Sequence, residues 1–367
     1  MITRTNNKKR GVFMKKISSY QFIALLLCCK LFNIMTYIPA KTDNGTLVLI
    51  TLVVTTIIEG VLLIPAIVFY KRHDGKGLLT FASSKSRALG LTLSLLFLLL
   101  CLWTIIQTLG DLTFFLQYCF SDTYSAWSVV IVTLAATLYV SQTGLSAVAR
   151  ATSIIVIITL LALAFIFTGF KHHIDFYELN LAVRNPAFEV LKSSPKFIAS
   201  SKELALFVIL LGALKSKPAK TAFLYLGVKL FVSLISALTS IIVLGDFIYL
   251  SKLPFFTLSA YSQTTIVEHY EAISMMLWTL CALVKLSVFT ISAGHCIHHI
   301  FPKAHSVLSD GVIVVLAGSV TLPIILDERW ESIAAPNTEA IITATLITFV
   351  PLCLLIFKRR QNAQEVM

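Results

Sequence analysis

The chain alternates long apolar segments with short polar connectors, and this alternation limits the possible folds more than any other feature of the sequence. A membrane-spanning helix needs ~20 predominantly apolar residues. Hydrophobic residues make up 57% of the 367 positions, enough for roughly ten such helices, and only 13% are charged. The sequence therefore predicts an all-α, multi-pass membrane protein and excludes a soluble enzyme. The ten expected transmembrane helices cover 17–38, 46–70, 89–118, 126–143, 152–170, 196–214, 221–247, 272–300, 311–326 and 338–357.

Lysine and arginine are distributed unequally between the two sets of connectors that ten spans would create. Nineteen lie on the side of the two termini, eight on the opposite side and three inside spans. Since basic residues concentrate in cytoplasmic loops, we expect both termini in the cytoplasm. The expected organisation is a basic N-terminus over 1–16, a single ten-helix domain over 17–357 and a tail over 358–367. The net charge of +12 is therefore assigned to membrane orientation and not to nucleic-acid binding.

The longest connector, 171–195, falls on the expected outer side. It mixes charged residues such as Glu178 and Lys192 with apolar ones such as Phe188 and Leu191. Such a mixture is typical of an amphipathic segment at a membrane surface. We expect it to lie over the outer mouth of the bundle, with contact to a partner protein as the alternative.

Span six contains a polar interruption. A Ser200-Ser201-Lys202-Glu203 cluster separates a short outer piece from an apolar run that ends at Leu214. That run is about 17 Å long as a helix, well short of the ~30 Å hydrocarbon core. In transporters built from inverted repeats, interrupted helices at equivalent positions of the two halves mark the binding site. Ten spans that divide into five and five make span one the equivalent of span six.

Span one has polar residues of its own. Lys30, Asn33 and Thr36 precede Pro39, and Lys30 lies about 20 Å from the expected cytoplasmic start of the span, close to the depth expected for Glu203. We therefore expect both helices to unwind halfway through the membrane around a polar pocket, because unpaired backbone groups are tolerated there only beside protein or water. A half-helix N-terminus could then receive a ligand carboxylate.

A simpler interpretation of span six remains open. The segment Ser200–Glu203 would then be the end of a loop, and Ser201 would cap the N-terminus of a late-starting helix.

Ionisable residues within the spans need partners, because a lone ionised side chain at mid-membrane costs at least ~2.5–3.5 kcal/mol. Lys285 is the deepest of them, and Glu203 and Glu59 are both possible partners. Lys229 and Asp246 lie near span ends, where we expect them to snorkel to the interface. The candidate substrate-binding residues are Lys30, Asn33, Thr36, Ser200, Ser201, Glu203 and Lys285.

Three histidines, His295, His298 and His299, share one face of span eight. The spacing would allow metal binding, but the sequence offers no carboxylate nearby. The group also falls at the expected cytoplasmic helix end, where imidazolium complements the helix dipole. We expect interfacial capping here, and neither a metal nor another cofactor.

A series of short motifs runs along the chain. It comprises Ile17-Ser-Ser-Tyr20-Gln21-Phe22 and Tyr37-Ile38-Pro39 around span one, Leu62-Leu63-Ile64-Pro65 before Tyr70-Lys71-Arg72, Gly144-Leu145 and Ala149-Arg150 before span five, Glu203 in span six, and Pro254-Phe255-Phe256 and Glu268 ahead of Trp278 and Lys285-Leu286-Ser287. In their joint order they resemble the spore germination permease family, the B-type integral membrane subunits of germinant receptors. This family belongs to the amino acid–polyamine–organocation superfamily.

The resemblance implies a five-plus-five inverted repeat and small nutrient germinants such as amino acids. It also implies A-type and C-type receptor subunits as partners and the spore inner membrane as the location. The chain departs from the superfamily in span one, where glycines are usual and this sequence has none between Lys30 and Thr36. It also has Ser146 where an acidic residue is frequent and Glu268-His269 where a Glu-Arg pair is frequent.

Three functions follow as hypotheses. The favoured one is a ligand-sensing receptor subunit, not an enzyme, which binds a small zwitterion between spans one, three, six and eight and shifts a conformational equilibrium that its partners read. The second is a proton- or cation-coupled amino acid permease of the same fold. The third, from a different class, is a membrane-embedded transferase with a histidine such as His295 or His172 in its site.

Overall fold

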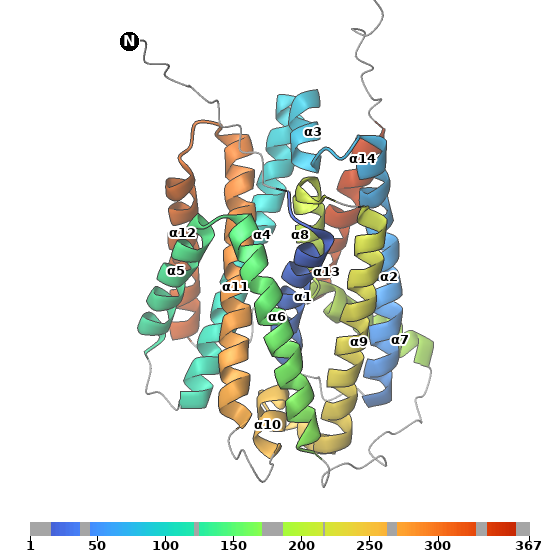
Figure 1. Ribbon diagram of the computed structural model, residues 1–367, viewed down its shortest axis with the longest axis vertical. Helices are drawn as coiled ribbons and strands as arrows, with labels where there is room; N and C mark the ends of the chain where they lie inside the picture. The colour runs from blue at the N-terminus through green and yellow to red at the C-terminus, as the bar shows by residue number, and fades with distance from the viewer. Residues whose placement is uncertain are drawn as a thin grey trace, which may run out of the picture.

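The structure is a computed structural model that describes residues 16–36, 45–120, 125–170, 186–215, 217–262, 270–327 and 336–356. Within these ranges it is all-helical, with a single isolated bridge between Ile17 and Leu214 (Figure 1). The α-helices are α1 Ser19–Met35, α2 Gly45–Arg72, α3 Leu78–Lys85, α4 Arg87–Phe120, α5 Ala126–Gln142, α6 Leu145–Thr168, α7 Pro186–Ala199, α8 Glu203–Leu210, α9 Pro218–Leu244, α10 Pro254–Tyr261, α11 Tyr270–Ile300, α12 Ser306–Leu326, α13 Pro336–Ala344 and α14 Val350–Leu355. Short 3-10 turns follow α8 (η2, Leu211–Ala213) and α9 (η3, Gly245–Tyr249), and a π-helical turn joins α13 to α14 (η5, Thr345–Phe349).

Seven helical stretches of the described residues are long and apolar enough to cross a membrane. They are α2, α4, α6, α9, α11, α12 and the continuous stretch Pro336–Leu355. Three apolar stretches are shorter, namely Ser19–Met35, Ala126–Gln142 and Glu203–Ala213. Each of the ten predicted segments overlaps one of these, so the all-helical, multi-pass membrane architecture is confirmed. Ten crossings, the inverted repeat, the domain limits and the cytoplasmic termini stay predictions.

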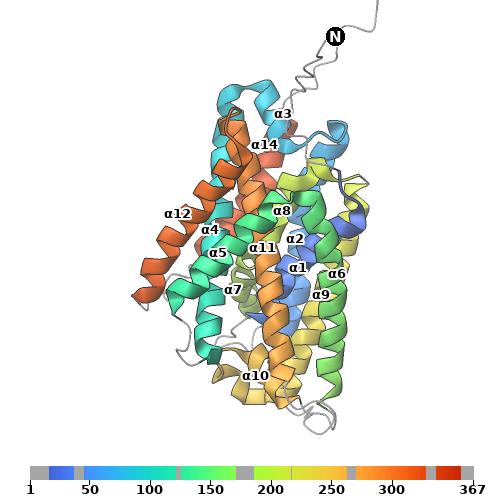
Figure 2. The same cartoon turned by 60° about the vertical axis from the view of Figure 1, so that its left-hand side comes forward.

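The outer surface of the bundle is apolar. Ile57 of α2, Leu161 of α6 and Val315 of α12 are 63%, 66% and 68% exposed. Large exposed apolar surfaces of this kind are unfavourable in water and suited to lipid. Of the helices that carry these side chains, α6 runs along the long axis of the bundle and α12 is tilted against it (Figure 2).

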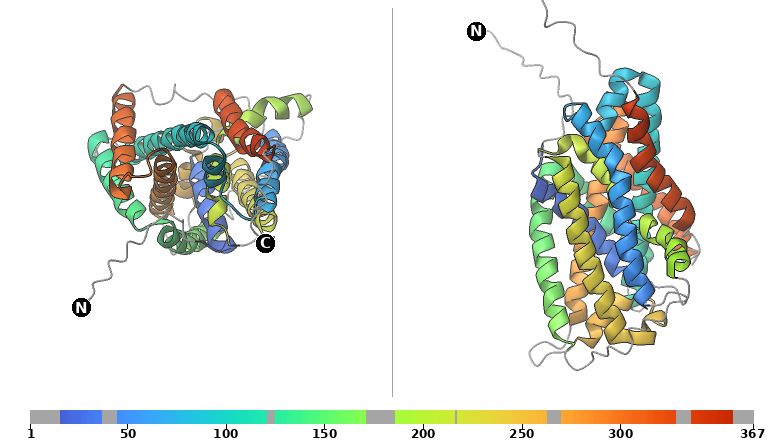
Figure 3. Two further views of the ribbon diagram at one scale, coloured as in Figure 1. Left: turned by 90° about the horizontal axis from the view of Figure 1, so that it is seen from above. Right: turned by 90° about the vertical axis from the view of Figure 1, so that its right-hand side faces the viewer.

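The two helices at the centre of the bundle, α1 and α8, are short. Every residue of α8 is buried, as are twelve of the seventeen residues of α1 from Phe22 to Met35. A helix that is apolar on all faces belongs inside a protein or a membrane. Longer helices surround this pair (Figure 3). Lys30 on α1 and Glu203 on α8 are therefore shielded from lipid by protein.

Two helix interruptions were predicted, and the structure contains one of them. The chain leaves helical geometry between Ala199 and Glu203, where α7 ends and α8 begins. The prediction that span one unwinds around Lys30 was wrong, because α1 continues without a break from Ser19 to Met35. No glycine or proline interrupts that stretch, and its polar side chains find partners from within a regular helix. Pro39 lies outside the described residues.

The predicted amphipathic connector is only partly described. Its second half forms α7, which packs against α2 and α13. Phe188 and Leu191 are exposed on one side of this helix, while Val190 and Phe197 are buried on the other. This half therefore carries apolar side chains on both sides, and its amphipathic character stays a prediction. Residues 171–185 lie outside the described ranges, and a position over an outer mouth stays a prediction.

Two glycines bring separate parts of one bundle end into close contact. A Cβ atom added at Gly212, in η2, would lie 2.7 Å from the Cα atom of Gly77 at the start of α3. Nearby, the backbone N–H of Ile17 donates to the carbonyl of Ala213 at 2.8 Å, and that of Lys215 donates to the carbonyl of Ile17 at 3.0 Å. This end of the bundle is closed by direct backbone contact between the start of α1 and the end of α8.

We predict that Gly212→Ala destabilises the protein, because the added methyl group meets backbone atoms that cannot rotate away. The expected cost is about 1–3 kcal/mol in free energy of unfolding, seen as a lower midpoint of thermal denaturation in detergent. Gly227→Ala in α9 is the matched control, since nothing lies within 4 Å of its added Cβ. A Gly212→Ala protein as stable as the control would contradict the close contact.

Candidate functional site

The interruption between α7 and α8 is held by the polar residues of α1. The Lys30 ammonium donates to the hydroxyls of Ser200 at 3.0 Å and Ser201 at 3.1 Å. The side-chain amide of Asn33 donates to the backbone carbonyl of Ser200. Lys30 and the interruption therefore lie at the same depth, as the sequence predicted. The contacts pass between side chains of a continuous helix and an open turn, and not between two unwound helices.

The turn itself uses local hydrogen bonds. The hydroxyls of Ser200 and Ser201 both donate to the carbonyl of Phe197, at 2.8 and 3.0 Å. The residue at the N-cap position of α8 is Lys202, which makes no side-chain cap. The alternative in which Ser201 acts as an N-cap was therefore wrong. Its oxygen instead accepts from two ammonium groups, Lys30 and, at 3.0 Å, Lys229 of α9.

Lys229 lies at the centre of a buried charged cluster. Its ammonium pairs with Glu59 of α2 and lies 3.9 Å from the nearer carboxylate oxygen of Glu203, which also accepts from the Tyr225 hydroxyl at 2.9 Å. Lys229 is 3% exposed and both glutamates are fully or almost fully buried. The expectation that Lys229 snorkels was therefore wrong. Two carboxylates inside the bundle give its ammonium a better environment than the distant interface does.

Lys285 of α11 meets α1 from the other side. Its ammonium donates to the side-chain oxygen of Asn33 at 2.6 Å and lies 4.5 Å from the centre of the Phe32 ring. Of the two expected partners, neither Glu203 nor Glu59 forms an ion pair with Lys285.

Thr36 is joined to the cluster only indirectly. Its hydroxyl accepts from the indole N–H of Trp278 at 3.1 Å, and Trp278 stacks on Phe32 with the ring centres 5.0 Å apart. Thr36 therefore stabilises the end of α1, next to Lys285. Asp246, which was expected to snorkel, lies in η3, and its side chain is not among those that the structure describes.

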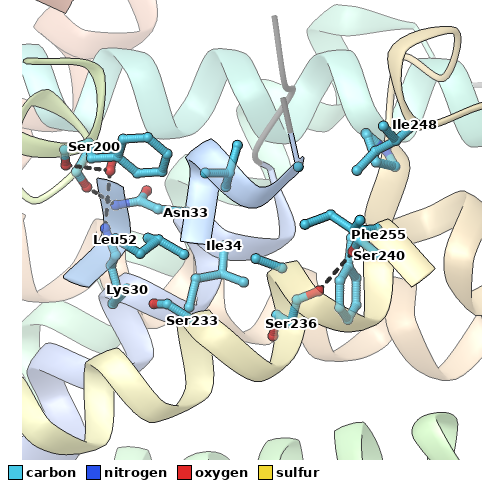
Figure 4. Close-up of a pocket in the computed structure, with 16 residues that line it drawn as sticks. Lys30, Asn33, Ile34, Leu52, Ser200, Ser233, Ser236, Ser240, Ile248 and Phe255 are labelled. Carbon is cyan, nitrogen blue, oxygen red and sulfur yellow. Dashed lines mark hydrogen bonds between the residues drawn. The ribbon is translucent and has the colours of Figure 1, made fainter. Parts of the chain in front are cut away.

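A cavity of about 80 Å³ adjoins the cluster. Figure 4 shows Lys30, Asn33 and Ser200 at one end of it, with Ser233 and Ser236 of α9 along one wall. The two serine hydroxyls have no hydrogen-bond partner among the described residues. Apolar side chains from α2, α7 and α10 complete the lining: Val48, Leu52, Phe197 and Phe255.

The predicted binding residues divide into two groups around this cavity. Lys30, Asn33 and Ser200 line it, whereas Ser201, Glu203, Lys285 and Thr36 lie behind them and hold them in position. The sequence interpretation missed the serine wall. The signal was present, since Lys229, Ser233, Ser236 and Ser240 recur at helical spacing on one face of α9.

A second ion pair fixes the turn from the opposite side. The Lys202 ammonium lies 2.7 Å from the Glu339 carboxylate of α13 and also contacts Gln107 of α4. Glu339 accepts from the Trp103 indole at 2.9 Å. The interruption is therefore tied to α1 and α9 on one side and to α4 and α13 on the other.

The histidine face of α11 offers no recognisable metal centre. Within the described ranges, no group of three His, Cys, Asp or Glu side chains is arranged to hold a metal ion. His299 instead contacts the hydroxyl of Ser83 in α3 at 3.2 Å.

We predict strong energetic coupling between Glu59 and Lys229. Lys229→Met leaves two carboxylates without their cation and is expected to cost about 3–5 kcal/mol, whereas Glu59→Gln with Lys229→Met should cost clearly less than the sum of the single changes. Double-mutant cycles on thermal stability in detergent measure this. The same cycle with Glu203→Gln and Lys285→Met serves as the comparison. We expect a smaller coupling energy for this second pair. Additive effects at Glu59 and Lys229 would contradict the ion pair.

Comparison with known proteins agrees with the motif order in the sequence. The family model described as spore germination protein matches residues 16–328, which include α1 to α12 and the charged residues around the interruption except Glu339. A search of curated proteins found no match. Because the family model covers most of the chain, the resemblance is confirmed, and this membrane protein belongs to the spore germination permease family.

Proposed function

We propose that the protein is the integral membrane subunit of a spore germinant receptor and senses a small nutrient with a carboxylate group in the cavity beside Lys30. The observation that carries this proposal is the environment of the Lys30 ammonium. It is 4% exposed, lies at the cavity wall and, among the described residues, contacts hydroxyl oxygens and forms no ion pair. A buried ammonium that forms no direct ion pair can accept a further charged partner, so a bound carboxylate would find a strong partner there.

The remaining walls suit an amino acid. The hydroxyls of Ser233 and Ser236 and the side-chain oxygen of Ser240 offer acceptors for an ammonium group. Apolar side chains such as Leu52 and Phe255 can receive an aliphatic side chain. The small volume of about 80 Å³ favours a ligand of a few heavy atoms. The ligand class proposed is therefore a small zwitterionic amino acid.

The cavity position supports sensing by a change in helix packing. Its walls come from five helices, α1, α2, α7, α9 and α10, so a bound ligand would contact all of them at once. A ligand shifts an equilibrium only through different affinities for the two states. We propose that A-type and C-type subunits read this shift, with the protein in the spore inner membrane. Ten crossings in two inverted sets of five, with cytoplasmic termini, are part of the proposal.

A proton- or cation-coupled permease is the second candidate, and the charged cluster favours it. Glu59 and Glu203 each have one buried carboxylate oxygen without a hydrogen-bond partner in the described structure. Together with Lys229 they form a set of ionisable groups that could exchange a proton during transport. Radiolabelled alanine uptake into proteoliposomes separates the candidates. Sustained concentrative uptake by the isolated chain would overturn the sensing-only function.

We predict that Lys30→Met abolishes the response to an amino acid germinant while leaving the protein in the membrane. Losing one charge-assisted contact is expected to weaken binding by at least about tenfold. The measurements are spore germination in a strain that carries the variant and alanine binding to the purified protein by calorimetry. Lys220→Met, at an exposed position of α9, is the matched control. Unchanged binding in Lys30→Met would contradict the proposed site.

A further inference from the structure

A second cavity lies at the end of the bundle where α5 turns into α6 and where α11 approaches α12. Its volume is about 540 Å³, far larger than that of the cavity beside Lys30, and its lining shares no residue with it. Figure 2 shows α5 and α12 side by side at the edge of the bundle next to this region. The lining is polar in part and includes Ser141, Gln142 and Asp310.

The cavity contains a buried carboxylate in a fixed orientation. Asp310 of α12 is only 6% exposed. Its Oδ2 atom accepts from the side-chain amide of Gln142 at 2.8 Å and lies 3.1 Å from the hydroxyl of Ser141. Its Oδ1 atom has no hydrogen-bond donor within the described part of the chain. One oxygen is therefore held by α5, and the other is left without a partner in a wall of the cavity.

Gly294 of α11 allows this orientation. A Cβ atom added at Gly294 would lie 2.5 Å from Oδ1 of Asp310, closer than any real contact of this type. The absence of a side chain at this position lets the carboxylate approach α11 directly. Beside it on the same helix, His295 and His298 line the cavity, and Nδ1 of His295 and Nε2 of His298 have no hydrogen-bond partner among the described residues.

The charges at the cavity point to a cationic ligand at this wall. Asp310 forms no ion pair with any described residue, and its partners Ser141 and Gln142 are neutral. Arg150 of α6 also lines the cavity, but its side chain is exposed. A buried carboxylate whose hydrogen-bond partners are all neutral is stabilised by a cation.

The kinds of acceptor atom in the cavity wall bear on whether the cationic ligand is a metal ion or an organic cation. Hard cations such as Na⁺ and Mg²⁺ prefer a shell of several oxygen ligands with more than one carboxylate among them, and Asp310 is the only carboxylate among the described residues that line this cavity. No metal-binding group of three His, Cys, Asp or Glu side chains occurs among the described residues. A primary ammonium group carries three N–H donors and fits a mixed set of oxygen and nitrogen acceptors.

We propose that this cavity is a second binding site, separate from the one beside Lys30, for a small primary ammonium compound. The ammonium group donates to Oδ1 of Asp310, and the imidazoles of His295 and His298 accept its further N–H donors. Gln142 positions the carboxylate, and Gly294 lets it pack against the backbone of α11.

The test uses the full-length protein in lipid nanodiscs with propylammonium chloride as the probe, followed by calorimetry at constant ionic strength. We expect saturable binding that Asp310→Asn weakens at least about tenfold, because a charge-assisted contact is lost. Arg150→Gln should tighten binding severalfold by removing a like charge. Tetramethylammonium, which has no N–H donor, and Na⁺ should bind much more weakly.

Asparagine at 310 keeps an oxygen that can accept from Gln142, so the Asp310→Asn protein is expected to fold. Ser309→Ala is the matched control, because Ser309 is buried on the same turn but does not line the cavity. Lys30→Met should leave propylammonium binding unchanged, which distinguishes this site from the proposed germinant site. Equal affinity in wild type and Asp310→Asn, no saturable binding, or equal binding of Na⁺ and propylammonium would each overturn the proposal.

Discussion

The structure depends on the placement of the Lys229 ammonium among oxygen atoms from two helices and from the turn between α7 and α8. An ammonium inside the membrane must be paired or neutralised, and Glu59, Ser201 and Glu203 surround this one. Because these partners belong to α2, to the interruption and to α8, the pairing fixes how α9 packs against all of them. The same contacts allow α8 to start in the middle of the bundle, where its free backbone groups would be unfavourable in lipid.

The interruption is therefore a supported structure and not a weak point. Lys30 reaches it from α1, Lys229 from α9, and the Lys202–Glu339 ion pair ties it to α13. Of these cations, Lys202 and Lys229 have carboxylate partners, whereas Lys30 is held by hydroxyls alone in the described structure. This inequality supports the proposal that an external carboxylate binds at the cavity wall beside Lys30.

The sequence predicted those features that depend on one segment at a time. Apolar length located the helices, and the Ser-Ser-Lys-Glu cluster located the interruption at Ser200, because both are properties of consecutive residues. Prediction from the sequence failed for those features that depend on packing between segments. The partner of Lys285 turned out to be Asn33, and Lys229 was buried instead of snorkelling, since both depend on the rotation of one helix against another. The unwinding of α1 was predicted by analogy between two halves, although its own residues favour a regular helix.

The two ends of the central pair differ, and this difference bears on how a signal could arise. Towards α10, the cavity borders Lys30 and Asn33. Towards α3, every residue of α8 is buried, Ile17 bonds to Ala213 and Lys215, and Tyr70 donates to Leu214 at 3.1 Å. A ligand that moved Lys30 would move α1 as one rigid helix, because α1 is continuous. The displacement would then be transmitted directly to the Ile17 contacts at the opposite end, about 20 Å away along the helix axis.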